Sequence, residues 1–225
     1  MFGRHGPSFP ARRRGGTKKW EQISNNSDSP NWLVENSQMA KFHAKCGTYQ
    51  IAYKRGAKLM EIIDEAEWII SNKKATHVIL DGIQNSVPEI IRGNLKLEDQ
   101  VLEKLRVLNM SAVVVLAEVL YCPEHQRLND ALNLVNRQVR RLNRAASGQA
   151  SPQPWKVLVS VKRDKGRKRK AQVSILPCAY SRDGYHISHP KAQEYEAKLA
   201  TYLKDLVMTT PTPGSTSNPT SSVRN

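Results

Sequence analysis

The sequence is poor in cysteine and has no long apolar run. Its 225 residues include three cysteines, Cys46, Cys122 and Cys178. They are odd in number and widely spaced, so they show no metal-ligand pattern and indicate a reducing compartment. No apolar run approaches the length needed to cross a membrane, and the N-terminus lacks the apolar segment of a secretory signal. We therefore expect a soluble intracellular protein, cytoplasmic or nuclear, without a transmembrane segment.

Two further absences limit the chemistry. The chain has no glycine-rich loop of the kind that cradles phosphates, so a nucleotide-enzyme signature is missing. Cys122 and His125 lie close together in the sequence, but without a second ligand pair this stretch predicts a loop rather than a metal site. We expect no metal and no other cofactor.

Acidic residues are scarce relative to basic ones. Lys and Arg number 35 and Asp and Glu number 20, which gives a formal net charge of +15. This excess predicts attraction to polyanions, most simply RNA or DNA, although any single basic run is also consistent with a solvated face. The candidate nucleic-acid-binding residues are Arg12, Arg13, Arg14, Lys18, Lys19, Arg137, Arg140, Arg141, Arg144, Arg167, Lys168, Arg169 and Lys170.

Apolar residues are also scarce at both ends of the chain, which is 39% hydrophobic as a whole. Residues 1–31 combine Gly, Pro, Ser and Asn with basic runs, and residues 208–225 are rich in Ser, Thr and Pro. Both segments are predicted to be disordered, the first as a basic arm. Residues 32–207 are long enough to enclose one substantial core and are predicted to form a single domain.

Apolar runs and helical stripes alternate through this middle segment. Strands are predicted at residues 32–34, 49–53, 76–80, 112–117 and 155–161. A further run at 173–176 is either the hairpin partner of the preceding strand or a final strand of the sheet. Helices are predicted where apolar residues recur at helical spacing, over 59–70, 97–108, 128–142 and 192–206. This order predicts a three-layer α/β fold, with a mostly parallel sheet flanked by helices.

Polar residues and glycines recur where predicted strands end or helices begin, which is where open α/β sheets carry their reactive groups. Asp183 precedes His186 by three residues and can accept a hydrogen bond from one ring nitrogen, which leaves the other nitrogen as a base. Alone, this spacing also describes a turn ahead of a helix. The residues just after a predicted strand or just before a predicted helix are Ser37, Gly56, Gln84, Asn85, Asp183 and His186.

In this order the motifs resemble those of the SGNH (GDSL-type) hydrolases, over about residues 32–207. The corresponding stretches are Val34-Glu35-Asn36-Ser37, Lys54-Arg55-Gly56-Ala57, Leu80-Asp81-Gly82-Ile83-Gln84-Asn85 and Asp183-Gly184-Tyr185-His186. The helix that carries Asn136, and the strand before it, look like those of retrotransposon-encoded esterase-like domains. The resemblance implies an SGNH/flavodoxin-like fold and an acyl-ester substrate.

The resemblance also implies a role for each residue. Ser37 would be the nucleophile, His186 the general base and Asp183 the group that orients it. The oxyanion hole would comprise the backbone amides of Ser37 and Gly56 and a side-chain amide of the third block, at Gln84 or Asn85. A glycine suits this role because its N–H can approach a ligand without a side chain intervening.

Four positions depart from the family pattern. Glu35 and Asn36 replace the Gly-Asp before the serine, Gln84 replaces the donor asparagine, and Asn85 replaces the aspartate after it. A carboxylate at position 35 would oppose a developing oxyanion if it pointed inward. Two functions therefore stay open. One is a serine esterase within a basic, nucleic-acid-binding protein of retrotransposon type. The other is a catalytically degenerate scaffold for nucleic-acid binding or self-association.

Overall fold

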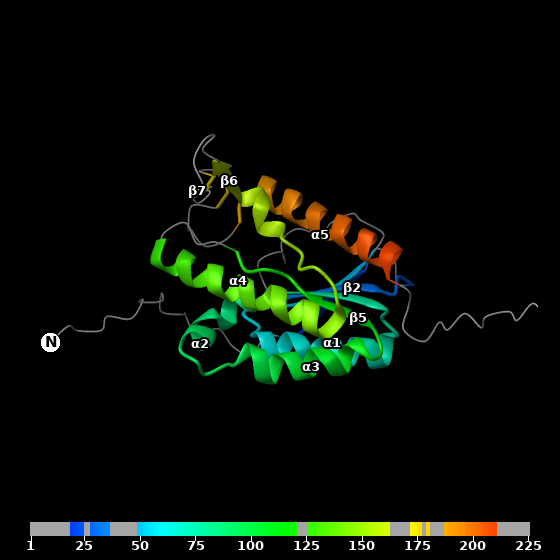
Figure 1. Ribbon diagram of the computed structural model, residues 1–225. Helices are drawn as coiled ribbons and strands as arrows, with labels where there is room; N and C mark the ends of the chain where they lie inside the picture. Colours follow the sequence, from blue (N-terminus) through cyan, green and yellow to red (C-terminus); the bar gives the residue numbers. More distant parts are fainter. Residues whose placement is uncertain are drawn as a thin grey trace, which may run out of the picture.

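A central sheet of five strands organises the computed structural model (Figure 1). The structure describes residues 19–24, 28–36, 49–120, 126–162, 172–176, 179–180 and 187–210. The strands are β1 (Glu21–Ser24), β2 (Asn31–Asn36), β3 (Gln50–Lys54), β4 (His77–Asp81) and β5 (Val113–Leu116). Their order is β1-β3-β2-β4-β5, with β1 antiparallel to β3 and the others parallel. The predicted mostly parallel α/β sheet is confirmed.

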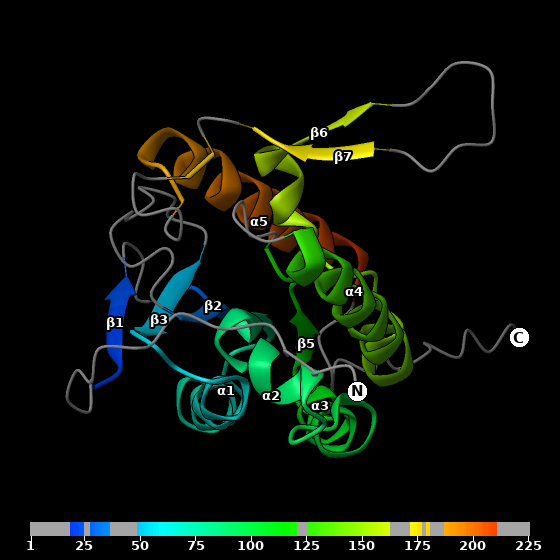
Figure 2. The same cartoon turned by 90° about the vertical axis from the view of Figure 1, so that its left-hand side faces the viewer.

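Side chains alternate between the two faces of this sheet, and each face buries its own core. On β2, Trp32 and Val34 point into one core while Leu33 points into the other. The first core is covered by α1 (Leu59–Lys73), α3 (Leu102–Asn109) and α4 (Gln126–Ser147), and the second by α5 (His189–Thr209). Figure 2 shows α1 and α3 on one side of the sheet and α5 on the other. The three predicted layers are therefore present.

Short helical turns connect these elements. They are the 3₁₀ turn η1 (Ile83–Ser86), the helix α2 (Val87–Ile91), the π turn η2 (Leu97–Val101) and the 3₁₀ turn η3 (Pro154–Leu158). In the described part of the chain no helix is both long and apolar enough to cross a membrane.

The stretch predicted as a strand at 155–161 is only partly one. Residues 154–158 form η3, and the strand β6 (Val159–Lys162) begins after it. The apolar residues Trp155 and Leu158 are three apart, so a tight turn buries both against α5, whereas a strand would have pointed them to opposite faces. β6 pairs antiparallel with β7 (Gln172–Ile175) as a separate hairpin. Of the two predictions for residues 173–176, the hairpin partner is therefore correct. The hairpin projects away from the body (Figure 2).

The sheet begins earlier in the chain than predicted. β1 lies within residues 1–31, the segment predicted to be a disordered arm, and it pairs with β3 in a register that sets Ile23 beside Ile51. Ile23 packs against the core beneath α5, and Trp20 packs against the opposite core. Four residues with one apolar side chain carried too little periodic signal to indicate a strand.

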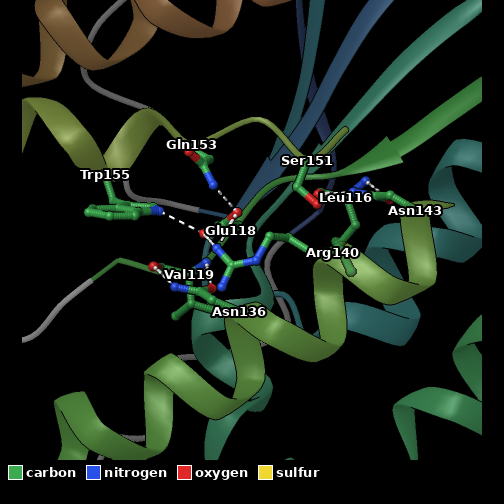
Figure 3. A network of polar contacts seen from close by, with 9 residues as sticks. All are labelled: Leu116, Glu118, Val119, Asn136, Arg140, Asn143, Ser151, Gln153 and Trp155. Atoms are coloured by element: carbon green, nitrogen blue, oxygen red, sulfur yellow. Dashed lines mark hydrogen bonds and ion pairs between the residues drawn. The ribbon is translucent and has the colours of Figure 1, made fainter. Parts of the chain in front are cut away.

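Asparagine side chains complete the backbone pairing along the outer edge of β5 and its continuation. Each amide accepts a hydrogen bond from one backbone N–H and donates to the carbonyl of the same residue. The pairs are Asn109 with Val114 (2.9 and 3.1 Å), Asn143 with Leu116 (2.9 and 2.8 Å) and Asn136 with Val119 (2.6 and 3.2 Å). The last two asparagines are seven residues, or two turns, apart on α4, so they face the edge together (Figure 3).

Candidate functional site

The first and third predicted blocks meet at the carboxyl end of β2. Asn36 ends this strand, and its Nδ2 donates to the carbonyl of Gly82, 3.1 Å away. A Cβ at Gly82 would lie 2.9 Å from the backbone nitrogen of Asn36 and 2.5 Å from Cδ1 of Ile62. The φ of Gly82 is also 153°, a conformation that favours glycine. Only glycine therefore allows the two segments to approach this closely.

The second block, residues 54–57, is held to the other two by contacts with the third block. Gly56 lies in the turn after β3 with a φ of 76°, which suits glycine, and it is exposed. Asn85 Nδ2 donates to the carbonyl of Ala57 at 3.0 Å, and the backbone N–H of Leu59 donates to the buried Oγ of Ser86 at 2.8 Å. Three blocks distant in sequence are thus fixed together at the carboxyl edge of the sheet.

The two candidate amides of the third block differ in what they contact. The Asn85 amide binds the backbone next to Gly56, so it supports the turn. The Oε1 of Gln84 is buried, and within the described residues it has no hydrogen-bond partner. This oxygen is an acceptor, whereas an oxyanion would have to be met by the donor nitrogen Nε2 of the same amide. Because the Asn85 nitrogen already binds Ala57, Gln84 is the remaining side-chain amide of this block.

The predicted nucleophile, base and orienting acid lie outside the described residues. Ser37, Asp183 and His186 therefore have no measured geometry, but the residues that flank them do. Asn36 directly precedes Ser37. An antiparallel bridge joins Tyr180 and Ile187, which lie on either side of Asp183 and His186 in the sequence.

The described residues next to the Asp183–His186 segment pack in the core beneath α5. Ile187 is buried in the core that contains Tyr195, and the backbone N–H of Ser188 donates to the carbonyl of Ala179 at 2.9 Å. Burial raises the pKa of Tyr195 well above its usual value, and nearby Asp81, Glu35 and Tyr180 raise it further. The printed polar contact of this tyrosine is with Asp81 at the end of β4.

Two carboxyl groups, the buried Glu35 and the half-buried Asp81, lie on the α5 side of the same strand ends. Glu35 is 2% exposed and is the register partner of Asp81 on β4. Burial raises the pKa of Glu35 well above its usual range, and Asp81 and Glu196 raise it further. Burial raises the pKa of Asp81 to about 6, while the Tyr195 hydroxyl, which donates to its Oδ2 at 2.9 Å, opposes that rise.

The orientation of Glu35 follows from strand alternation. Its side chain lies on the face of β2 opposite to Asn36, and its raised pKa favours the neutral acid. No local pattern could reveal that Glu35 pairs in register with Asp81, because the two residues lie 46 positions apart in the sequence. Asp81 could have been noticed as a carboxyl at the end of a buried strand. Within the described residues, no group of three or more His, Cys, Asp or Glu side chains is placed to hold a metal ion.

The candidate nucleic-acid-binding residues are only partly described. Arg12, Arg13, Arg14, Lys18, Arg167, Lys168, Arg169 and Lys170 lie outside the described residues. Lys19, Arg137, Arg141 and Arg144 are exposed, and Arg141 also lies 3.7 Å from the carboxylate of Glu98. The predicted basic side of α4 is therefore a real exposed surface at three of its four arginines.

The fourth arginine, Arg140, forms an ion pair within the fold. Nη1 of Arg140 lies 3.1 and 3.0 Å from the two carboxylate oxygens of Glu118, whose side chain is fully buried. The same carboxylate accepts from Gln153 Nε2 at 2.6 Å and from Trp155 Nε1 at 2.9 Å (Figure 3). Arg140 thus pairs with a buried carboxylate 22 residues earlier while its side chain stays 36% exposed, and its contact with a nucleic acid stays a prediction.

Comparisons with known proteins agree with this architecture. No protein-family model and no curated protein sequence matches the chain. Among solved structures, a GDSL-like lipase of Bacteroides thetaiotaomicron matches with a TM-score of 0.56 at 16% identity, over 79% of this chain and 88% of that one. The psychrotrophic esterase EstA of Pseudoalteromonas sp. matches with a TM-score of 0.54 at 9% identity, over 80% of this chain and 100% of that one.

A retrotransposon protein is also similar. The esterase domain of the ORF1 protein from the zebrafish ZfL2-1 retrotransposon covers 77% of this chain and 99% of its own, at 14% identity and a TM-score of 0.35. We take the fold from the two bacterial proteins. The chain has the SGNH-type hydrolase fold of esterases and lipases, as its motifs predicted.

Proposed function

We propose that this SGNH-type domain hydrolyses acyl esters, with Ser37 as nucleophile, His186 as general base and Asp183 as the carboxylate that orients it. The observation that carries the proposal is the junction of Asn36 with Gly82, to which the Asn85–Ala57 hydrogen bond adds the Gly56 turn. These contacts gather three family blocks at one edge of the sheet, directly before position 37.

The proposed reaction has two steps. The hydroxyl of Ser37 attacks the ester carbonyl carbon while His186 takes its proton, and the carbonyl oxygen becomes an oxyanion. The oxyanion accepts hydrogen bonds from the amides of Ser37 and Gly56 and from the side-chain amide of Gln84. The alcohol then leaves with the proton from His186, and water attacks the acyl-enzyme by the same route to release the acid.

The test is the hydrolysis of p-nitrophenyl acetate by the full chain and by Ser37→Ala. Ser71→Ala is the matched control, because Ser71 is exposed on α1. We expect the rate to fall at least about a hundredfold in Ser37→Ala, since loss of a nucleophile removes the covalent route, and to stay unchanged in the control. Equal rates for wild type and Ser37→Ala would refute the hydrolase and leave the degenerate scaffold.

A second proposed function is the binding of RNA or DNA. The β6–β7 hairpin supports it, because residues 163–171, which join the two strands, contain six basic residues and one acidic residue. The exposed arginines of α4 add a second basic surface. The proposed setting, a basic protein of retrotransposon type, rests on this charge and on the sequence resemblance.

Salt dependence tests the binding function. We expect the logarithm of the association constant for a single-stranded RNA or DNA oligonucleotide to fall linearly with the logarithm of salt concentration, because phosphate contacts release counterions. Fluorescence polarisation between about 50 and 200 mM salt measures this slope. An association constant that stays flat over the range would contradict the proposal, and comparison of the two oligonucleotides would show which nucleic acid binds more tightly.

A further inference from the structure

We propose that Glu35 and Asp81 share a proton and thereby lock the ends of β2 and β4 together, so that Glu35 is a positioning residue for the chain at Ser37. The importance of this lock for hydrolysis rests on the proposed function. The lock itself is a property of the fold and can be tested without an ester substrate.

The geometry begins with strand register. Glu35 and Asp81 are paired positions on adjacent parallel strands, which lie about 4.8 Å apart, and both side chains point to the α5 face. Asp81 Oδ2 accepts the hydroxyl hydrogen of Tyr195, whereas Oε2 of Glu35 is buried and has no hydrogen-bond partner within the described residues. A proton between the two carboxyl groups would satisfy this oxygen, since a protonated carboxyl gains an O–H donor.

Among the described residues, the titratable groups that influence the pair from neighbouring elements are acids and phenols. Tyr53 of β3 is the register partner of Glu35 on its other side, and its hydroxyl donates to Glu21. Tyr195 and Glu196 face the pair from α5, and Tyr49 donates to Glu196 Oε1 at 2.8 Å.

Two further groups complete these surroundings. Tyr180 raises the pKa of Tyr195, and the exposed Arg55 lowers that of Tyr53. Two adjacent carboxyls in such surroundings resist double ionisation and titrate as a coupled pair.

The direction of the pH effect follows from these surroundings. Burial raises the pKa of Asp81 to about 6 and that of Glu35 well above its usual range, so the folded chain keeps protons that the unfolded chain has already released. The stabilising effect is complete below the unfolded pKa values and is lost as the pH rises through the folded ones. Loss of the last proton leaves two anions at paired positions of β2 and β4, one of them two residues before Ser37 in the sequence.

The test follows the thermal unfolding midpoint from pH 4 to pH 9. We expect the wild-type midpoint to fall by roughly 5–10 °C as the pair ionises, and Glu35→Gln to flatten this fall because an amide keeps a donor and carries no charge. Glu67→Gln is the matched control, since Glu67 is exposed on α1, and its profile should follow the wild type. Parallel profiles for wild type and Glu35→Gln would overturn the proposal.

Two additions make the outcome decisive. If Glu35→Gln does not fold, a carboxyl ¹³C titration of the wild type replaces it, with two coupled transitions expected and separate, ordinary transitions overturning the proposal. Ser37→Ala should keep the wild-type unfolding profile. If hydrolysis is absent and the pH profiles differ as expected, the esterase is refuted and the shared proton stands. If hydrolysis is present and the profiles are parallel, the shared proton is refuted and the esterase stands.

Discussion

At the scale of single residues, Gly82 makes the junction of two blocks possible. Its replacement by alanine would force a Cβ to within 2.9 Å of the Asn36 nitrogen and 2.5 Å of Ile62 Cδ1. We expect Gly82→Ala to lower the free energy of unfolding by about 3 kcal/mol, because overpacking adds to backbone strain. Urea denaturation measures the change.

Gly93→Ala separates these two causes. Gly93 has a φ of 76°, but a Cβ there meets nothing within 4 Å, so its replacement adds strain without a clash. We expect a loss of about 1 kcal/mol for this variant. Equal losses for the two glycines would show that the close approach of Asn36 to Gly82 contributes nothing.

Gln84 and Asn85 are adjacent but should respond differently to truncation. Gln84→Ala should lower kcat for ester hydrolysis by about a hundredfold and leave the unfolding midpoint nearly unchanged, because an oxyanion donor acts in the transition state. Asn85→Ala should lower the midpoint, because it removes the bond to Ala57. An unchanged kcat in Gln84→Ala would show that the oxyanion is stabilised elsewhere.

At the scale of elements, the asparagines that cover the edge of β5 are expected to be costly to remove. Asn143 is fully buried and pairs with both backbone groups of Leu116 and with Ser151 Oγ at 2.8 Å. Asn143→Ala should lower the free energy of unfolding by about 3 kcal/mol, since it leaves buried backbone groups unpaired.

The matched control for this element is Asn94→Ala. Asn94 is exposed, and its replacement should change the free energy of unfolding by less than about 0.5 kcal/mol. Chemical denaturation of both variants under one set of conditions gives the comparison. A loss in Asn143→Ala no larger than in the control would mean that water satisfies the strand edge just as well.

The elements with strong periodicity were predictable from sequence. The stripe of Leu59, Ile62 and Ile63 defined α1, and the continuous apolar run before Asp81 defined β4, because both signals depend only on neighbours in the chain. β1 and η3 were not predictable in this way. β1 depends on pairing with β3, and η3 depends on a core that α5 completes.

The site was predictable only where family motifs carried it. The meeting of the blocks that contain Gly56 and Gln84 followed from their order along a parallel sheet. The pairing of Arg140 with Glu118 and of Glu35 with Asp81 depends on contacts across the fold, which no local pattern reports.

At the scale of the whole molecule, charge is the property most open to test. Lys168→Ala/Lys170→Ala and Lys198→Ala/Lys204→Ala each remove two lysines, the first pair from the hairpin connection and the second from the exposed side of α5. We expect only the first double variant to weaken oligonucleotide binding and to reduce the salt slope by about two. Equal slopes in both would indicate that net charge, and not the hairpin, attracts the nucleic acid.

The closed edge of the sheet has a consequence for crowding. Copies of a cationic protein that collect along one polymer reach high local concentrations, at which bare strand edges can recruit each other into fibrils. Here amide groups from α3 and α4 occupy the hydrogen-bonding sites of β5 that a neighbour's strand would need. Edge-to-edge growth from that side of the sheet is blocked, so the proposed gathering along a nucleic acid would not extend the sheet there.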